Sequence, residues 1–389
     1  MHAKYIIGFI VLSIFALFAI FSPIHAQEFG LKRVYVKSKN DKGLAYFSRF
    51  IHQSFDDDVF SIELPVQAID ALKHNPNIEF RGEVSLWQVT NDSASPQLRQ
   101  ISARSKPSAV CAPANPTPWG VSKVHGGSGG GGIKVAVVDT GVTTSHPDLK
   151  ANIIDCKDLQ TSRIRSQCTD GLGHGTHVAG TIAAKGAIVG VAPDAKIMAL
   201  KVCSDGGWCY GDDVARGIRY AADHGANIIN ISLGGSTLST DEKNAIDYAT
   251  NKGVLIVAAA GNSGPGPNTI NYPAAYNRVV SVAAIDSTDA VANFSSRGIN
   301  DGDYIREERE IELAAPGVSV ESTWKNGCYA VLSGTSMATP HVVGLAAKLW
   351  QGDAGTTRQL LENRARYNYT DIGKPGDDTD AGFGLPTAP

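Results

Sequence analysis

Short apolar runs alternate with amphipathic segments along the C-terminal two thirds of the chain. The segments 214–223 and 241–250 have helical character, and each stands between strand-like runs. Strands that alternate with helices in this way build a mostly parallel sheet with helices on both faces. The pattern therefore predicts an α/β domain, whose strands we expect at 134–138, 196–202, 227–232, 254–260 and 278–285.

The region before residue 90 follows a different pattern. Short strand-like runs and two helical segments make up this region, which resembles a small β-α-β-β-α-β-like module. We expect a small α+β, ferredoxin-like domain over 27–90. Its predicted strands are 33–36, 60–64, 78–80 and 84–89, and its predicted helices are 44–52 and 67–73.

The N-terminus has the pattern of a secretory signal. Lys4 precedes an apolar run over 5–21, and a Ser-Pro-Ile-His-Ala segment ends at Ala26. Such a segment is removed on export, so we expect a secreted, extracellular protein without stable membrane association. The alternative is an uncleaved membrane anchor, because the apolar run is long for a signal.

A polar stretch separates the two patterned regions. It is rich in Ser, Pro, Ala, Asn and Arg, a composition typical of an exposed linker, where processing commonly occurs. The chain thus divides into a signal (1–26), a small domain (27–90), a linker with a processing site (91–116) and a larger domain (117–389).

Charge and cysteine content narrow the classes of function. The formal net charge of −3 gives no reason to expect nucleic acid or an anionic membrane as a partner. Export would permit disulfide bonds among the six cysteines, and proximity suggests Cys156–Cys168 and Cys203–Cys209. No C-x-x-C occurs, which argues against a zinc ribbon or a thioredoxin-type site.

One stretch combines a sharp turn with a serine at a helix start. The run 333–341 reads Ser-Gly-Thr-Ser-Met-Ala-Thr-Pro-His, and it connects a short strand to a helix of small residues. Backbone N–H groups at a helix start favour negative charge, so Ser336 could attack a carbonyl while amides hold the oxyanion. Alternatively, Thr335 or Ser336 only caps the helix.

Two further polar residues follow buried strand runs. Asp139 begins an Asp-Thr-Gly segment and Asn262 ends a Gly-Asn segment. Catalytic groups gather at the carboxyl ends of strands in α/β sheets, although each residue could simply form a turn. An aspartic protease would need a second Asp-Thr-Gly or Asp-Ser-Gly, which the sequence lacks. Asn262 could donate its amide to an oxyanion.

A glycine-rich segment, 170–181, carries two histidines three residues apart. His174 opens a helix of small residues, and His177 lies one turn further along. The two could face one metal ion, but there is no H-E-x-x-H and no evident third ligand. We expect His174 at the exposed helix start and His177 as a hydrogen-bonded residue of the core.

Together these segments resemble the subtilisin family of secreted serine proteases, from about residue 117 to 385. The resemblance implies a subtilisin-like α/β fold and serine-type endopeptidase activity. It rests on five motifs in the family's order Asp, His, Asn, Ser: Val-Asp-Thr-Gly-Val at 138–142, His-Gly-Thr-His-Val-Ala-Gly-Thr at 174–181, Ser-Leu-Gly-Gly at 232–235, Ala-Ala-Gly-Asn at 259–262 and the run 334–341.

The resemblance also implies a role for each motif residue. Ser336 is the expected nucleophile, and His174 is expected to take its proton and pass it to the leaving amine. Asp139 is expected to hold the imidazole tautomer. Asn262, together with the backbone N–H of Ser336, is expected to form the oxyanion hole.

Substrate recognition is implied by the same resemblance. A peptide is expected as an added strand along Ser232, Leu233 and Gly234. Tyr210 is expected to flank a distant pocket, and Asn271 to lie near the base of the pocket for the residue before the scissile bond. We expect broad specificity for protein and peptide substrates. The segment 27–90 resembles the family's inhibitory propeptide, so a self-processed zymogen is expected.

The resemblance implies two further features. We expect that no cofactor is required for the chemistry, and structural calcium is possible, because Asp148 is present. However, the segment 185–190 is too short for the family's usual calcium loop. In the family fold the regions that carry Cys111 and Cys328 are neighbours, which predicts a third disulfide between them.

Two other classes of function stay open at this point. One is a secreted binding module with an inactive protease fold. The other is a metallohydrolase that uses Asp139, His174 and His177. A serine-directed reagent and a chelator would distinguish both from a serine protease.

Overall fold

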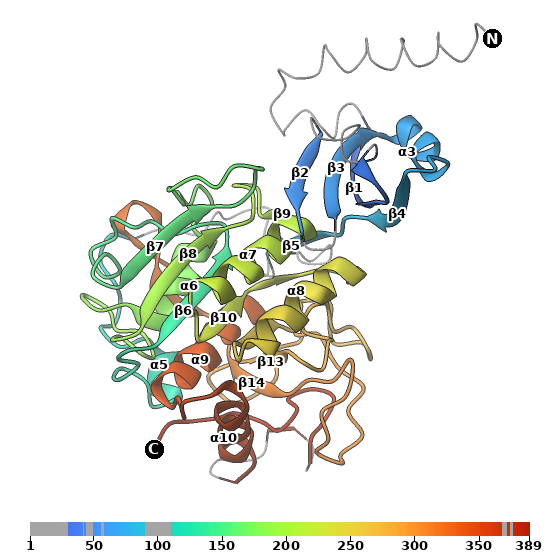
Figure 1. Cartoon of the computed structure of the whole chain (residues 1–389). Coiled ribbons are helices and arrows are strands. Elements are labelled where there is room, and N and C mark those ends of the chain that lie inside the picture. Colours follow the sequence, from blue (N-terminus) through green and yellow to red (C-terminus); the bar gives the residue numbers. More distant parts are fainter. Residues whose placement is uncertain are drawn as a thin grey trace, which may run out of the picture. The chain divides into compact units, whose positions relative to one another are not determined.

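The computed structural model describes residues 30–41, 43, 50–55, 58–89, 110–367, 372–373 and 376–389. They belong to two compact units, which divide between Val84 and Ser85 (Figure 1). The predicted signal, most of the predicted helix 44–52 and most of the predicted linker lie outside the described residues. Among the residues described, no helix is long and apolar enough to cross a bilayer.

The first unit contains a four-stranded antiparallel sheet and the helix α3 (Val66–Lys73). The sheet has the order β2-β3-β1-β4, and its core includes Val34, Ile62 and Leu72. The predicted strands 33–36, 60–64 and 78–80 and the helix 67–73 are confirmed. Residues 51 and 52 were predicted to be helical, but they lie in β2, which pairs with β3. The strands are β1 (Leu31–Ser38), β2 (Ile51–Ser54), β3 (Val59–Pro65) and β4 (Ile78–Glu83).

The second unit is built on a seven-stranded sheet whose pairings are all parallel. The strand order is β14-β13-β12-β10-β6-β8-β7. All five strands predicted for this domain are confirmed, whereas β7 and β14 were not predicted. The strands are β6 (Lys134–Asp139), β7 (Ile153–Asp158), β8 (Lys196–Lys201), β10 (Ile228–Ile231), β12 (Leu255–Ala259), β13 (Val280–Ile285) and β14 (Leu313–Pro316).

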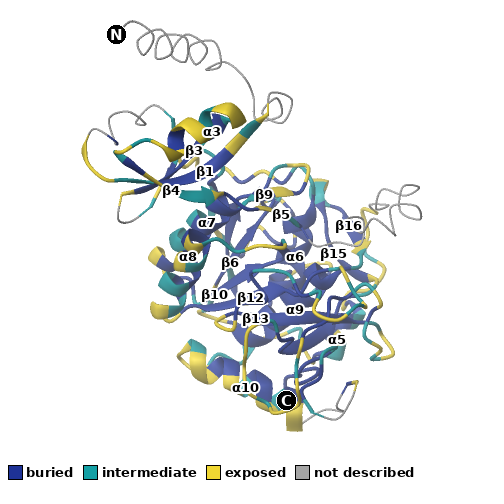
Figure 2. Cartoon of the chain, turned by 90° about the vertical axis from the view of Figure 1, so that its right-hand side faces the viewer, coloured by how far each residue is buried: buried dark blue, intermediate teal, exposed yellow. Residues whose placement is uncertain are grey.

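Helices cover both faces of this sheet, as the sequence predicted. Two helices, α7 and α8, pack against each other, and α6 packs against α9 (Figure 1). Burial is deepest in the sheet and in the pair α6 and α9 (Figure 2). The helices of the unit are α5 (Trp119–Lys123), α6 (His174–Ala183), α7 (Gly211–Asp223), α8 (Thr240–Asn251), α9 (Thr335–Lys348) and α10 (Ala354–Tyr367).

Two small antiparallel sheets complete the second unit. One joins β15 (Val320–Thr323) to β16 (Tyr329–Leu332), with the short 3-10 turn Lys325–Gly327 between them. The other places β5 between β9 and β11. The predicted strand 84–89 therefore forms as β5 and belongs to the second unit. These three strands are β5 (Leu86–Val89), β9 (Trp208–Tyr210) and β11 (Leu233–Gly234).

Small residues let α6 and α9 sit deep in the core. Every residue of α6 is buried. A Cβ at Gly180 would lie 2.1 Å from the hydroxyl oxygen of Thr323, so only glycine allows α6 to approach β15 this closely. In α9, a Cβ at Gly344 would lie 2.5 Å from the Cβ of Val191. Both helix starts are thereby held at fixed positions relative to the sheet.

Three disulfide bonds link the six cysteines, and all three predicted pairings are confirmed. Cys111–Cys328 ties the segment before α5 to the segment before β16, across 217 residues. The bonds Cys156–Cys168 and Cys203–Cys209 close local loops of 12 and 6 residues. Closing a long loop restricts the unfolded chain most, so the Cys111–Cys328 bond is expected to stabilise the fold most.

Two of the buried histidines in these core helices, His177 in α6 and His341 in α9, form hydrogen bonds with backbone carbonyls. The Nε2–H of His177 faces the carbonyl oxygens of Val320 (3.0 Å) and Ala330 (3.2 Å). The Nδ1–H of His341 faces the carbonyl oxygen of Met337 at 2.8 Å. The prediction that His177 is a hydrogen-bonded residue of the core is confirmed.

We expect these histidines to make the protein less stable in acid. Burial lowers the pKa of His177 to about 3 and that of His341 to about 4, from an ordinary value of 6.5. Below pH 6.5 these two histidines therefore bind protons in the unfolded chain while they stay neutral in the folded chain. Their contribution to stability is complete above that pH and is lost as the pH falls toward 4.

Urea unfolding at about pH 7 and about pH 4.5 measures this effect, in a full chain that carries Ser336→Ala to remove the candidate nucleophile. Adding His341→Gln should reduce the acid-induced loss in the free energy of unfolding by on the order of 2 kcal/mol. The matched control His224→Gln changes an exposed histidine and should leave the loss as it is in the parent. If the parent and His341→Gln lost the same free energy of unfolding in acid, buried His341 would not be a source of the acid sensitivity.

Candidate active site

A carboxylate–imidazole pair lies at the carboxyl end of the interior strand β6. Asp139 ends β6, and His174 is the first residue of α6. The Nδ1 of His174 is 2.8 Å from Oδ1 of Asp139, and both side chains are fully buried. The backbone N–H of Thr140 also donates to this oxygen, at 2.7 Å. The Nε2 of His174 has no hydrogen-bond partner among the described residues.

The burial of His174 corrects one expectation from the sequence. His174 does open a helix, but its ring is not exposed as predicted. The reason is that the first turn of α6 packs against the chain that leaves β6. A Cβ at Gly175 would lie only 2.1 Å from the carbonyl oxygen of Gly141, so glycine is required at this contact.

Asp170 fixes the start of α6, and sequence reasoning gave it no role. Its Oδ1 accepts hydrogen bonds from the Gly173 N–H (2.7 Å) and the Thr140 hydroxyl (2.9 Å). Its Oδ2 accepts from the N–H of Thr176 at 2.8 Å. The carboxylate thus satisfies N–H groups that a helix start leaves unpaired. An acidic residue just before a predicted helix was the available signal.

Ser336 lies in the first turn of α9, after Gly334. Its Oγ–H donates to the carbonyl oxygen of Ser232 at 2.8 Å, and the Ser232 hydroxyl donates to the carbonyl oxygen of Ser336 at 3.0 Å. The structure therefore joins Asp139 to His174 and Ser336 to Ser232. Nε2 of His174 has no hydrogen-bond partner among the described residues, so the structure contains no hydrogen bond between this atom and Ser336.

Asn262 lies next to the serine through its neighbour in the chain. Its Oδ1 accepts hydrogen bonds from the backbone N–H of Thr335 (3.0 Å) and from the Thr335 hydroxyl (2.9 Å). These two donors orient the amide, so its NH₂ group points elsewhere. That Nδ2 is buried and has no hydrogen-bond partner within the described chain.

The strand β5 occupies the edge that the sequence analysis assigned to substrate. It runs antiparallel to β11, where Val89 pairs with Leu233 and Gln88 with Gly234. On its other side Leu86 pairs with Tyr210 of β9. The predicted substrate residues Leu233, Gly234 and Tyr210 therefore flank a strand of the chain itself.

The Trp87 side chain anchors β5 in the second unit. It is only 1% exposed, and its Nε1–H donates to the carbonyl oxygen of Thr237 at 3.0 Å. A Cβ at Gly235 would lie 2.5 Å from the indole, so glycine makes room for the ring. Asn271 lies beside this edge, since a Cβ added at Gly234 would be 3.3 Å from the Cβ of Asn271.

The predicted metal-related residues have partners in the chain. Asp139, His174 and His177 do not bring ligand atoms together as a metal group within the described residues. Asp148 accepts N–H bonds from Ala187 (2.9 Å) and Ile188 (3.2 Å) and a hydroxyl bond from Tyr329 (2.8 Å). Burial, and after it the hydrogen bond to Asp148, raises the pKa of the Tyr329 phenol.

Comparison with known proteins identifies the family. The model of the Subtilase family matches residues 130–384. A curated relative, Subtilisin of Bacillus sp. (strain TA39), is 41% identical over 91% of this chain and 90% of the relative. Thermitase of Thermoactinomyces vulgaris is 42% identical over 64% of this chain and 85% of its own length.

A solved structure, S41 Psychrophilic Protease, is 44% identical, with a TM-score of 0.69 over 72% of this chain and 100% of its own. Sphericase is 45% identical, also with a TM-score of 0.69, over 71% of this chain and 99% of its own. The predicted subtilisin-like fold and the serine endopeptidase class are confirmed by these matches. The chain belongs to the subtilase family of serine endopeptidases.

Proposed function

We propose that this chain is a secreted, self-processing endopeptidase that cleaves peptide bonds through an acyl-enzyme on Ser336. The observation that carries the proposal is the buried Asp139–His174 pair, whose Nε2 has no partner among the described residues. The helix with this imidazole packs against the helix with Ser336. Protein interiors normally pair buried polar atoms, so an unpaired Nε2 favours a reactive site over an inactive binding module.

In this mechanism the Ser336 oxygen attacks the scissile carbonyl carbon while His174 Nε2 takes the hydroxyl proton. Asp139 accepts from Nδ1–H, which leaves Nε2 free to act as the base and stabilises the imidazolium. The imidazolium then protonates the leaving amine, and the C–N bond breaks to leave an ester on Ser336. Water attacks that ester while His174 takes its proton, the acyl C–O bond to Ser336 then breaks as the imidazolium returns the proton to the Ser336 oxygen, and the carboxylic acid product leaves.

The oxyanion of each tetrahedral intermediate needs donors that are already in place. Asn262 Nδ2 and the backbone N–H of Ser336 are the proposed donors, and Thr335 holds the amide in the required orientation. The Ser336 hydroxyl must exchange its bond to Ser232 for one to His174. Such catalytic hydrogen bonds often form only with substrate bound.

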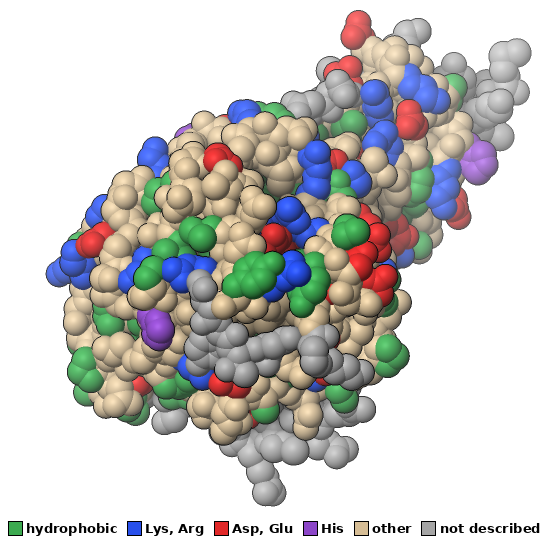
Figure 3. Space-filling model, turned by 90° about the horizontal axis from the view of Figure 1, so that it is seen from below, with side chains coloured by type: hydrophobic (Ala, Val, Ile, Leu, Met, Phe, Trp, Pro, Cys, Tyr) green, Lys and Arg blue, Asp and Glu red, His purple; other side chains and the backbone are tan. Residues whose placement is uncertain are grey.

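The proposed substrates are extended segments of proteins and peptides. The position of β5 between β9 and β11 supports recognition through main-chain hydrogen bonds, which depend little on side-chain type and fit a broad specificity. On the face drawn in Figure 3, basic and acidic side chains are interspersed over the described residues. This mixed surface fits a protein whose partners are peptides rather than nucleic acid.

The same strand supports self-processing. Because β5 comes from the end of the proposed propeptide, 27–90, the chain presents its own segment to the site before it is cut. The proposed signal, 1–26, would direct export. No cofactor takes part in the proposed chemistry. The carboxylate of Asp148 is engaged by three donors of the chain, which supports the expectation that calcium does not bind there in the family's usual form.

A fluorophosphonate probe tests the proposed reaction. Protein obtained by expressing the full chain should be labelled covalently at Ser336, because only an activated serine attacks this reagent. Ser336→Ala should abolish labelling, whereas the matched variant Ser333→Ala should label normally. Peptide mapping by mass spectrometry locates the adduct.

Two outcomes would overturn the proposed function. Folded protein that is neither labelled nor proteolytic would indicate a binding module. Proteolysis that a chelator stops, with no labelling of the serine, would indicate a metallohydrolase.

Substitution of Asn262 tests the oxyanion donor separately. Asn262→Ala should lower kcat by about 10²–10³-fold, roughly 3 kcal/mol, a size taken over from the equivalent donor in subtilisin. Asn262→Asp is the sharper variant, since it keeps an oxygen for Thr335 but removes the NH₂ donor. Steady-state kinetics and thermal unfolding are measured together. A variant with normal kcat and normal stability would remove Asn262 from the mechanism.

A further inference from the structure

Ser85 is the residue just before β5. All of its polar atoms form hydrogen bonds with other residues of the second unit. Its N–H donates to Oε1 of Glu242 at 3.2 Å, and its hydroxyl donates to Oε2 of Glu242 at 2.9 Å. Its carbonyl oxygen accepts from the N–H of Gly211 at 2.8 Å. The hydroxyl is also 3.2 Å from that of Thr237, and Ser85 is only 8% exposed.

The carboxylate that holds Ser85 is itself fixed by its helix. Glu242 is the third residue of α8 and forms a capping box with Ser239. The Ser239 N–H donates to Oε2 of Glu242 at 2.8 Å, and the Glu242 N–H donates to the Ser239 hydroxyl at 3.2 Å. Since Glu242 is 1% exposed, its side chain has little freedom to turn elsewhere.

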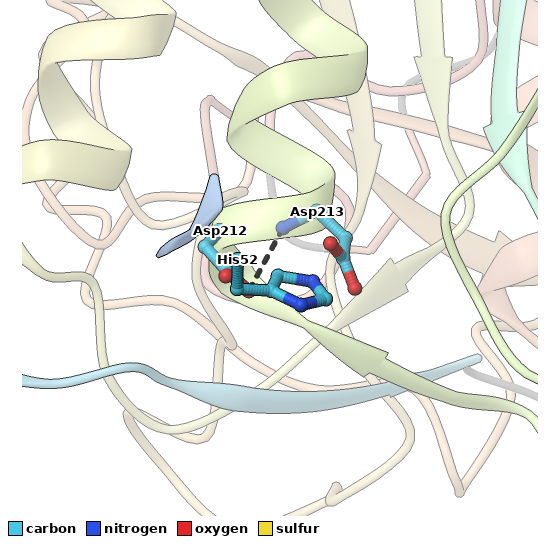
Figure 4. A group of neighbouring side chains, drawn as sticks. All are labelled: His52, Asp212 and Asp213. Carbon is cyan, nitrogen blue, oxygen red and sulfur yellow. Dashed lines mark hydrogen bonds between the residues drawn. The ribbon is translucent and has the colours of Figure 1, made fainter. Parts of the chain in front are cut away.

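The start of α7 shapes the space around this carboxylate. A Cβ at Gly211 would lie 1.9 Å from Oε1 of Glu242, so only glycine admits the carboxylate here. Figure 4 shows Asp212 and Asp213 in the first turn of α7, where the Asp213 N–H donates to Oδ1 of Asp212. His52, also drawn there, belongs to the first unit. Burial, and to a smaller degree the charge of Asp212, raise the pKa of Glu242.

A buried carboxylate in this position discriminates between side chains, because it accepts hydrogen bonds and donates none. A serine hydroxyl satisfies Oε2, whereas alanine would leave it without that donor. Sites built to bond a hydroxyl reject the analogue that lacks one. The next side chain, Leu86, is 41% exposed, and Trp87 is buried again. Buried side chains therefore alternate with an exposed one along this segment, so the second unit can discriminate at the positions of Ser85 and Trp87 but not at that of Leu86.

We propose that Glu242, Gly211 and Thr237 form a subsite that selects serine in the bound peptide, two residues before the residue at the Trp87 position. This inference rests on the proposed function, because it takes β5 as occupying the substrate edge. The favoured substrates are then extended peptides of the form Ser-x-Trp upstream of the cleaved bond, which the chain's own Ser85-Leu86-Trp87 exemplifies.

Peptide competition tests the subsite in protein that has been expressed as the full chain and has processed itself. The peptide of residues 82–89 and its Ser85→Ala form are tested as inhibitors of the hydrolysis of a chromogenic substrate. This substrate is too short to reach the Glu242 subsite. With wild-type protease, Ser85→Ala should weaken inhibition at least about tenfold, since a hydrogen bond to a charged group is lost. With Glu242→Ala the two peptides should inhibit almost equally.

Matched controls separate recognition from damage. The Leu86→Ala peptide changes an exposed side chain and should inhibit both proteases much like the parent peptide. Glu242→Gln retains the capping box if Glu242→Ala does not fold, and it should lower the preference for serine. Gly211→Ala displaces the carboxylate without changing its charge and should do the same.

The inference is overturned if wild-type protease does not distinguish the two peptides, or if Glu242→Ala distinguishes them as strongly. Hydrolysis of the short substrate shows independently that the proposed function stands. If the chain neither hydrolyses it nor processes itself, unfolding of the full chain with Ser85→Ala, Glu242→Ala and both tests the contact. Additive effects would then remove the subsite, and non-additive effects would support it.

Discussion

The candidate site depends on keeping a carboxylate and an imidazole together in the interior. A carboxylate is costly to bury unless it is hydrogen-bonded, and Oδ1 of Asp139 accepts from both His174 and Thr140. The pair can form only if α6 starts where β6 ends. Asp170 secures that geometry by bonding the N–H groups of the first turn of α6 and the hydroxyl of Thr140.

Close packing of small residues carries this constraint to Ser336. Glycines at 175 and 180 let α6 lie against β6 and β15, and Gly344 lets α9 approach Val191. The two helices pack on each other, so the imidazole and the serine are set by one rigid core rather than by mobile loops. Cys111–Cys328 ties the segment before α5 to the segment before β16, close in sequence to Ser336.

Much of this could be predicted from the sequence, because the signals are local. The apolar runs predicted the central strands of the sheet, and motifs at strand ends and helix starts pointed to Asp139, His174, Asn262 and Ser336. The disulfide Cys111–Cys328 followed from family resemblance rather than from spacing. The predicted exposure of His174 was wrong, because burial depends on what packs over a helix start.

The contacts that sequence reasoning missed are long-range or depend on exact backbone geometry. Ser85 and Glu242 are 157 residues apart, and no local pattern connects them. Glu242 reads by itself as a helix-capping residue, which it also is. The role of Asp170 depends on the direction of the N–H and hydroxyl groups that donate to it. The need for glycine at position 211 is apparent only from the nearby Oε1 of Glu242.

The most direct test of the account is the rate at which Asp139→Asn reacts with a fluorophosphonate, compared with wild type. An asparagine amide can donate to Nδ1 of His174, which leaves the proton on Nε2 and removes the base. The account predicts labelling slower by on the order of 10⁴-fold, the size of the kcat loss for this change in a related catalytic triad, with thermal stability little changed. Labelling within about tenfold of wild type in a folded Asp139→Asn protein would contradict the central claim.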